Sequence, residues 1–173
     1  MFAVTQHGVR IDSHEPGIVN AVHHRHDCVI TVLDNRTTAM TGHQPHPGTE
    51  RDGMGYEAQM LLVEDVVRGL GVEHVEVVNP NNLAKTREAF QRALAYRGTS
   101  VVVSKAPCRL LLPTRGSFEV VEEKCTQCSR CIQEFGCPAF YYDEDHIRIN
   151  ETLCSACGVC TQVCPSGAIR RKK

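Results

Sequence analysis

The stretch from Cys125 to Cys164 reads CTQCSRCIQEFGCP at residues 125–138 and, starting seventeen residues after Cys137, CSACGVCTQVCP at residues 154–165. Each run contains Cys-x-x-Cys-x-x-Cys and ends with a further Cys-Pro. Three cysteines on a tight loop can direct their sulfurs toward one point, whereas a cysteine beyond that loop points elsewhere. The prolines fix φ directly after the last cysteine and end each loop. The pattern predicts two similar sites with sulfur ligands.

Such a repeat is typical of bacterial ferredoxins with two 4Fe–4S clusters, in which the fourth cysteine of each run binds the other cluster. The spacing therefore predicts two crossed ligand sets. One cluster takes Cys125, Cys128, Cys131 and Cys164, and the other takes Cys137, Cys154, Cys157 and Cys160. The alternatives are zinc and disulfides. Zinc needs only two cysteine pairs, and disulfides need an oxidising compartment that no secretory segment indicates.

The two runs differ in one loop length. Five residues separate Cys131 from Cys137, whereas three separate Cys160 from Cys164. The two additional residues enlarge the loop without removing a ligand. We expect them to alter the surroundings of the second cluster rather than its presence.

Composition limits the possible partners. The chain has 173 residues and a net charge of -1, which gives no electrostatic reason for a nucleic-acid or anionic-membrane partner. No apolar run approaches the ~20 residues of a membrane span. The N-terminus lacks the basic start and apolar core of a signal peptide, and together these features predict a cytoplasmic protein.

The first part of the chain alternates helical and strand patterns. Short β-branched runs indicate strands buried on both faces of a parallel sheet, and the alternation is typical of an α/β fold with right-handed crossovers. Asn82 is expected to cap the longest helix, and Leu83, Phe90 and Leu94 to be its apolar positions. The predicted elements are a helix at 17–26, a strand at Cys28–Asp34, a loop at 35–57, a helix at 60–71, a strand at Val75–Val78, a helix at 83–98 and a strand at Ser100–Lys105.

Three segments follow from these patterns. Residues 1–108 form the α/β domain, residues 109–117 a linker with Pro113 and Gly116, and residues 118–170 a small α+β ferredoxin-like domain. Short strands at 119–121 and 147–149 are expected to lead into the two cysteine runs.

A long loop leaves the carboxyl end of the first buried strand, where open α/β sheets bind their ligands. It begins LDNRTTAMTGHQPHPG at residues 33–48. Asp34 and Asn35 present a carboxylate and an amide where Mg²⁺ and a diphosphate could bind. The Asn35 amide oxygen and the Thr37 carbonyl suit Mg²⁺, which prefers a few oxygen ligands plus substrate phosphates. The alternative interpretation is an ordinary polar turn, and the residues alone leave both open.

This loop resembles the thiamine diphosphate segment of the α subunit of indolepyruvate ferredoxin oxidoreductases. Its Asp-Asn…Met-x-Thr-Gly-x-Gln pattern is similar to one shared by other 2-oxoacid:ferredoxin oxidoreductases. The resemblance continues in order through PGIVNAVHHRHDCVITV, GLGVEHVEVVNPNNL, SVVVSKAPC and the cysteine runs. The family's α subunit is much longer, so the chain resembles its C-terminal part: a portion of the thiamine-binding domain followed by the ferredoxin domain.

The resemblance implies a chemistry and a set of partners. In that family, thiamine diphosphate and Mg²⁺ serve the oxidative decarboxylation of an aryl pyruvate or other 2-oxoacid to an acyl-coenzyme A. Electrons leave through the clusters to ferredoxin. The partners implied are a β subunit, the N-terminal part of the α subunit, coenzyme A and the 2-oxoacid, so the chain is expected to be incomplete as an enzyme on its own. The cofactor-binding residues implied are Asn35, Thr37, Met40, Thr41, Gly42 and Gln44.

One departure from the family pattern concerns the metal. The family has Gly-Asp-Ser, whose Asp binds Mg²⁺, where this chain has Gln6, His7 and Gly8. Replacing Asp with His removes an anionic oxygen that a hard cation prefers. The alternative function is therefore a dicluster electron carrier with a vestigial thiamine domain. No catalytic residue is assigned from the sequence.

Other polar residues have simpler explanations. His23, His24 and His26 fall at a predicted helix C-terminus, where positive charge is favourable. His43 and His46 flank the cofactor loop, and His43 is a candidate contact to substrate or diphosphate. Cys28 and Cys108 are expected to be small buried residues. His146 is expected on the surface of a hairpin, and the RRKK tail is expected to be either a solvated end or a docking site for an acidic partner.

Overall fold

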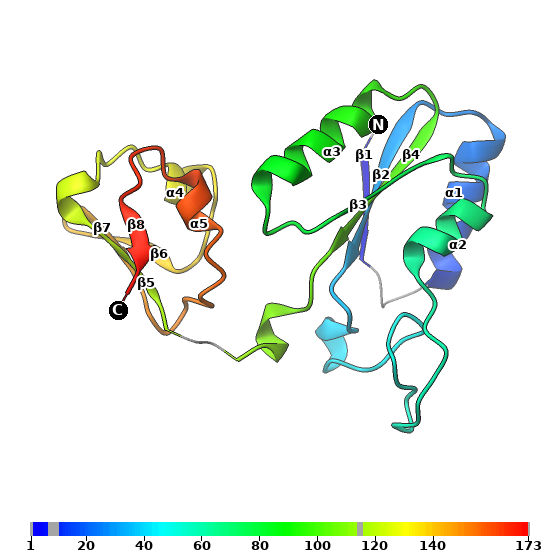
Figure 1. The fold of residues 1–173 in the computed structure, drawn as a ribbon, viewed down its shortest axis with the longest axis horizontal. Helices are drawn as coiled ribbons and strands as arrows, with labels where there is room; N and C mark the ends of the chain where they lie inside the picture. Colours follow the sequence, from blue (N-terminus) through cyan, green and yellow to red (C-terminus); the bar gives the residue numbers. More distant parts are fainter. Residues whose placement is uncertain (1, 7–10, 114–115, 173) are drawn as a thin grey trace. The chain divides into compact units, whose positions relative to one another are not determined.

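The computed structural model describes residues 2–6, 11–113 and 116–172, with the side chains of residues 2–6 and 11–15 left out of the description. The chain forms two compact units, Met1–Cys108 and Arg109–Lys173 (Figure 1). Within the described ranges, no helix has both the length and the apolar character needed to cross a bilayer.

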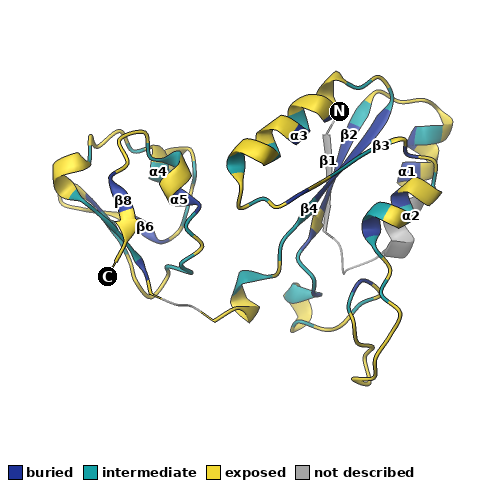
Figure 2. Ribbon diagram, viewed as in Figure 1, coloured by how far each residue is buried: buried dark blue, intermediate teal, exposed yellow. Residues whose placement is uncertain are grey.

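The first unit is built on a four-stranded parallel sheet in the order β1-β2-β4-β3. Its strands are β1 (Phe2–Gln6), β2 (Cys28–Asp34), β3 (His74–Val78) and β4 (Thr99–Lys105). The two central strands are rich in Val and Ile, and Ile30 of β2 lies opposite Val101 of β4. Their interior positions are buried, which confirms strands covered on both faces (Figure 2).

Three helices cover the sheet: α1 (Ile11–His23), α2 (Val63–Gly69) and α3 (Leu83–Ala95). Alternate residues of the central strands point to opposite faces. Ile30 and Val32 pack with residues of α1 and α2, whereas Val29 packs with residues of α3. The order strand, helix, strand confirms the predicted α/β class.

The buried face of α3 differs from the prediction. Ala89 and Ala93 are fully buried, whereas Leu94 is 56% exposed. The small side chains bring the helix close to β4, and the Ser100 hydroxyl donates to the Ala93 carbonyl at 2.9 Å. The predicted cap is confirmed, because the Asn82 side chain accepts from the Lys85 N–H at 3.1 Å.

Two elements near the N-terminus differ from the sequence prediction: a strand that was not predicted and a helix with other bounds. Strand β1 was not predicted, and it pairs in parallel with β2 at the edge of the sheet. Helix α1 begins at Ile11, before Pro16, and ends at His23 rather than residue 26. The helix stops because Arg25 adopts a left-handed conformation, with φ of 53°.

The second unit contains two small antiparallel sheets. Strand β5 (Phe118–Val120) pairs with β8 (Ile169–Arg171), and β6 (Phe140–Asp143) forms a hairpin with β7 (His146–Ile149). The unit also contains the short helices α4 (Arg130–Gln133) and α5 (Cys160–Val163) and the 3-10 turns η2 (Arg109–Leu111) and η3 (Glu122–Lys124). Phe140, Ile147 and Ile169 form its buried core with Cys160.

Of the basic tail, residues 170–172 are described, and they are exposed while taking part in the fold of this unit. Arg170 and Arg171 belong to β8. The Arg170 guanidinium pairs with Glu119 at 2.8 Å, and the Lys172 ammonium pairs with Glu151. These charges are engaged within the unit, and His146 is exposed in the hairpin as predicted.

Candidate metal centres and cofactor loop

The two cysteine runs share a backbone pattern. Gln127 and Ala156, at equivalent positions between the first two cysteines of each run, have φ of 52° and 53°. Ser129 and Gly158, one residue after the second cysteine, have φ of 60° and 76°. Left-handed residues other than glycine are costly and persist where the surrounding structure enforces them. The internal repeat read from the cysteine spacing is therefore also present in the conformation.

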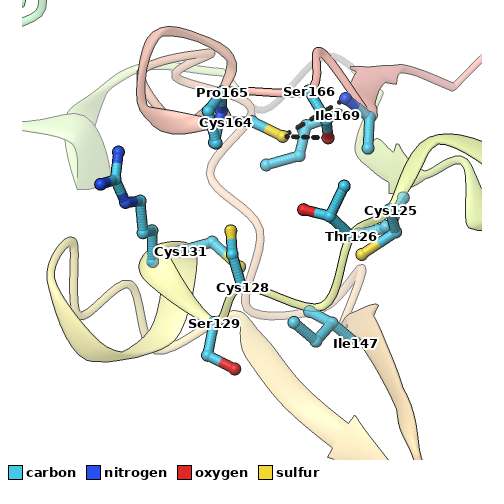
Figure 3. Close-up of a pocket in the computed structure, with 13 residues that line it drawn as sticks. Cys125, Thr126, Cys128, Ser129, Cys131, Ile147, Cys164, Pro165, Ser166 and Ile169 are labelled. Carbon is cyan, nitrogen blue, oxygen red and sulfur yellow. Dashed lines mark hydrogen bonds between the residues drawn. The ribbon is translucent and has the colours of Figure 1, made fainter.

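A pocket in the second unit brings together cysteines from both runs (Figure 3). It is lined by Cys125, Cys128 and Cys131 of the first run and by Cys164 of the second. Its apolar walls include Val120, Ile147 and Ile169. The fold thus brings together the four cysteines that the spacing grouped as one ligand set.

Cys164 has a polar environment on one side. Its Sγ accepts from the Ala168 N–H at 3.3 Å and lies 3.5 Å from the Ser166 hydroxyl. Burial raises the pKa of the Cys164 thiol, but the hydrogen bonds from Ser166 and from the backbone outweigh burial, and the pKa ends below its ordinary value. The surroundings favour the thiolate, which is the form that binds metals.

The second predicted group is also brought together. Burial, assisted by the nearby sulfurs of Cys157, Cys137 and Cys154, raises the pKa of the Cys160 thiol to about 12. Burial likewise raises the pKa of Cys131, assisted by the sulfurs of the first group. A buried thiol with other sulfurs around it, such as Cys160 or Cys131, needs a nearby positive centre to become a thiolate.

A single ion does not match these groups in the described residues. Among them, no three His, Cys, Asp or Glu side chains converge closely enough to hold one metal ion. A 4Fe–4S cluster has its ligand sulfurs farther apart, because each sulfur binds a different iron atom. The donor set, two Cys-x-x-Cys-x-x-Cys loops each followed by a further cysteine, is typical of 4Fe–4S clusters.

Arg109 supports the second cysteine run and was not identified from the sequence. Its guanidinium donates to the Ser155 carbonyl through Nε at 2.9 Å and through Nη2 at 2.6 Å. Ser155 lies between Cys154 and Cys157. No spacing rule connects residues 46 apart, so only the fold reveals this support.

In the first unit, the predicted metal ligands share one turn at the carboxyl end of β2. The Asn35 side-chain oxygen accepts from the Thr37 N–H at 3.3 Å. Thr37 is buried, and the Asn35 carbonyl accepts from the Cys108 N–H at 2.8 Å. The turn offers two neutral oxygens, the Asn35 amide and the Thr37 carbonyl, which suit Mg²⁺ when phosphate oxygens complete its shell.

The remaining loop residues form a tight turn beyond Thr37. The turn contains the 3-10 helix η1 (Ala39–Thr41), which ends at Gly42 with φ of 112°. The Thr41 hydroxyl donates to the Gln44 side-chain oxygen at 2.6 Å, and the Gln44 amide donates back to the Thr41 carbonyl. Met40 is 80% exposed. The loop keeps its own polar groups paired and presents Met40 to solvent.

An ionic network around the buried Asp34 anchors this loop and was not predicted. Asp34 is 2% exposed, and its carboxylate accepts from the Arg36 N–H at 3.0 Å. It also lies 3.5 Å from the Arg36 guanidinium and 3.8 Å from the Lys105 ammonium. Lys105 in turn contacts Glu64 at 2.7 Å. Asp34 is committed to these cations, so it positions the loop rather than offering a metal ligand.

The histidines near the loop have different roles. The His43 Nε2 lies 3.7 Å from the Cys108 sulfur, and both residues are half-buried rather than fully buried. Burial lowers the pKa of His46, Asp34 raises it, and Arg36 lowers it, with a net lowering. His46 also lines a surface cavity of about 290 Å³ within residues 45–59.

The other predicted residues do not join this site. His23, His24 and His26 are exposed at the end of α1, where their rings contact one another. Cys28 is half-buried beside the sheet core. His7, which stands where the family has its metal-binding Asp, lies outside the described residues.

Comparison with protein families matches both units. Residues 13–104 match the C-terminal TPP binding domain of the thiamine pyrophosphate enzymes. Residues 147–170 match a 4Fe-4S binding domain. The first match covers β2, β3, nearly all of β4 and the loop after β2, whereas β1 lies outside it. The second covers the run that begins at Cys154.

Comparison with individual proteins gives close relatives. The chain is 46% identical over 157 residues to the indolepyruvate oxidoreductase subunit IorA of Methanothermobacter marburgensis, covering 90% of this chain and 25% of that protein. It is 43% identical over 164 residues to the IorA subunit of Archaeoglobus fulgidus, covering 91% and 26%. The chain thus spans about a quarter of the length of these relatives, which are named as subunits.

A solved structure shares the fold. The 2-oxoglutarate:ferredoxin oxidoreductase from Magnetococcus marinus, with 2-oxoglutarate, coenzyme A and succinyl-CoA bound, aligns with a TM-score of 0.55 and 12% identity. The alignment covers 62% of this chain and 39% of that one. At this identity, the likeness concerns the fold alone.

Proposed function

We propose a function on the premise that this chain belongs to the thiamine pyrophosphate enzymes, whose C-terminal TPP binding domain it carries at residues 13–104. The chain is the part of a 2-oxoacid:ferredoxin oxidoreductase that joins a thiamine diphosphate loop to two 4Fe–4S clusters. The observation that carries this proposal is the pocket at which Cys164 meets Cys125, Cys128 and Cys131. It unites the two cysteine runs of a chain that is 46% identical to an IorA subunit.

The chain's own residues have defined tasks at the thiamine loop. Asn35 and Thr37 offer the oxygens for Mg²⁺, and Thr41, Gly42 and Gln44 shape the turn alongside the diphosphate. Asp34, held by Arg36 and Lys105, fixes the start of the loop against the sheet. When bound, thiamine diphosphate supplies the electron sink for decarboxylation of a 2-oxoacid.

The second unit has the residues of an electron-transfer domain with two clusters. Its two ligand sets are the crossed groups: Cys125, Cys128, Cys131 and Cys164 for one cluster, and Cys137, Cys154, Cys157 and Cys160 for the other. Apolar walls from β5, β7 and β8 limit water around the first group. The cysteine loops hold the sulfurs in place, which keeps structural change on electron transfer small.

The relatives support a more specific assignment. Their name indicates indolepyruvate, so we propose an aryl pyruvate as the 2-oxoacid, coenzyme A as the acyl acceptor and ferredoxin as the electron acceptor. Because the chain spans about a quarter of these relatives, the proposed partners are a β subunit and the N-terminal part of an α subunit. The full reaction belongs to that assembly.

Two measurements on the full chain test the proposal. After anaerobic reconstitution with iron and sulfide, we expect iron and sulfide contents of two clusters and the EPR signals of reduced 4Fe–4S centres. Calorimetry with thiamine diphosphate should then show micromolar binding that depends on Mg²⁺. The Asn35→Ala variant should lose the Mg²⁺ dependence, whereas Asn79→Ala, on the loop after β3, should not.

The outcomes separate the two candidate functions. Clusters with thiamine diphosphate binding support the oxidoreductase component. Clusters without binding, in a chain that carries His7 where the family has Asp, favour a dicluster electron carrier with a vestigial thiamine domain. A chain that binds no iron contradicts both.

A further inference from the structure

The two cysteine groups differ in the residue two places after their Cys-Pro cysteine. The first run continues Cys137-Pro138-Ala139, and the second continues Cys164-Pro165-Ser166. The repeat therefore places an alanine at one site and a hydroxyl at the other. Ala139 is 2% exposed within the unit core and has no side-chain polar group to offer a sulfur.

Ser166 is oriented toward the sulfur of Cys164. The distance from its Oγ to the Cys164 Sγ is 3.5 Å, and the Ala168 N–H donates to the same sulfur at 3.3 Å (Figure 3). A cysteine bound to iron is a thiolate and can only accept, so the Ser166 hydroxyl becomes the donor. At the corresponding position of the first run, Ala139 has no hydroxyl, so no such donation to a sulfur can come from its side chain.

Hydrogen bonds to cluster sulfurs are among the factors that set a reduction potential. Reduction adds one negative charge to a cluster, and a donor pointed at a ligand sulfur stabilises that charge. No bond is formed or broken in this step, and no proton is transferred. A cluster with such a donor is therefore easier to reduce than a similar cluster without it.

We propose that Ser166 is a positioning residue that raises the reduction potential of the cluster held by Cys125, Cys128, Cys131 and Cys164. One electron added to the unit then resides preferentially in that cluster, while the Cys137-containing cluster stays oxidised. This inference rests on the proposed cluster ligation. It adds a prediction of which cluster is reduced first, and neither the cysteine spacing nor the relatives provide that information.

The test is a potentiometric titration of the reconstituted full chain with dithionite and mediators, followed by EPR. Ser166→Ala should lower one of the two midpoint potentials and leave the other unchanged. A charge-assisted hydrogen bond is strong enough for about a tenfold change in the reduction equilibrium, or about 59 mV for one electron. The paramagnetically shifted Cys164 β-protons in NMR should identify the affected cluster.

Two variants separate tuning from structural damage. Ser166→Thr keeps the hydroxyl at an exposed position and should retain the parent potential. Ser129→Ala makes the same chemical change in the same pocket, but that hydroxyl contacts the Gln127 carbonyl and the Tyr142 hydroxyl rather than a sulfur. It should leave both potentials unchanged.

The results distinguish this inference from the proposed function. Full cluster content with both potentials unchanged in Ser166→Ala overturns the tuning role alone. An equal shift in Ser129→Ala also overturns it, because any loss of a hydroxyl then has the same effect. A parent chain without clusters overturns the ligation and the tuning together.

Discussion

The Lys105 ammonium lies 2.7 Å from both carboxylate oxygens of Glu64, which joins the carboxyl end of β4 to the first turn of α2. Lys105 also lies 3.8 Å from the buried Asp34. The pair is the outer part of the ionic network beneath the proposed cofactor loop. Its two side chains are 22% and 14% exposed, so solvent weakens their attraction less than at a surface pair.

Glu64→Gln should destabilise the first unit in a pH-dependent way. Burial alone raises the pKa of Glu64, but the Lys105 hydrogen bond and charge lower it below its ordinary value. The carboxylate therefore stabilises the fold above about pH 4.3, and this contribution is lost as pH falls through the lower folded-state pKa. At pH 7, urea unfolding should show a loss of about 1–3 kcal/mol.

The control is Asp65→Asn, which removes an exposed pair with Arg68 at 3.2 Å. It should change the stability by less than about 0.5 kcal/mol. If Glu64→Gln remains equally destabilising at acid pH, where the parent carboxylate is protonated, the ion pair is not the cause.

Cys164→Ser should remove the cluster of the first cysteine run rather than the cluster nearer in sequence. The reason is the pocket in which Cys164 lies with Cys125, Cys128 and Cys131. Iron content should fall by about half after reconstitution, because one of the two clusters loses a thiolate ligand. The hyperfine-shifted β-proton resonances of Cys160 should remain.

Cys137→Ser is the reciprocal variant, because Cys137 is among the sulfurs near Cys160. It should preserve the cluster at Cys125 and remove the other. Loss of the sequence-adjacent cluster in either variant contradicts the crossed assignment.

Arg109→Ala should weaken the second cysteine run. Two donations from the guanidinium to the Ser155 carbonyl hold the segment between Cys154 and Cys157. Their loss should cost about 1–3 kcal/mol of local stability and speed iron release to a chelator from that cluster. Arg109→Lys should give an intermediate rate of iron release, because an ammonium lacks the fixed geometry for both hydrogen bonds.

Arg130→Ala is the matched control, because Arg130 lies in the first cysteine run and pairs with the exposed Glu134 at 3.4 Å. Iron release from the cluster bound by Cys154 should keep the parent rate in this variant. If Arg109→Ala and Arg130→Ala accelerate iron release equally, the cause is the loss of a positive charge and not the loss of the Arg109 hydrogen bonds.

Ala93→Leu should destabilise the α/β unit because α3 lies close to the sheet. Ala93 is 1% exposed, and the Ser100 hydroxyl donates to its carbonyl at 2.9 Å. A larger side chain has to displace the helix, at about 1–3 kcal/mol in urea unfolding. Leu94→Ala, on the exposed side of the same helix, should cost less than about 0.5 kcal/mol.

The sequence predicted the elements whose signals are local. Strand β2 has the predicted bounds, Asn82 caps α3, and the two cysteine runs share the expected repeat. For these features, neighbouring residues supply most of the constraint. The grouping of Cys164 with the first run came instead from the pattern of two-cluster ferredoxins, in which the fourth cysteine of each run binds the other cluster.

The missed features depend on contacts between distant residues. Strand β1 is stabilised by pairing with β2, and Phe2–Gln6 lacks the continuous β-branched run that indicated β2 and β4. The buried face of α3 was misassigned to Leu94, because periodicity ranks large apolar residues above alanines and does not include the distance to the sheet. Arg109 and Lys105 act on partners more than 40 residues away.

The exchange of one cysteine between the two runs has a topological consequence. One proposed cluster links Cys131 to Cys164, 33 residues apart, and the other links Cys137 to Cys154, 17 residues apart, so that the second closure lies inside the first. Such closures restrict the unfolded chain, as disulfides do, and matter most where the hydrophobic core is small. Oxidative loss of one cluster then also frees a segment that carries a ligand of the other. Each centre is therefore expected to stabilise the other, so that a chain with one cluster releases its iron faster than a chain with both.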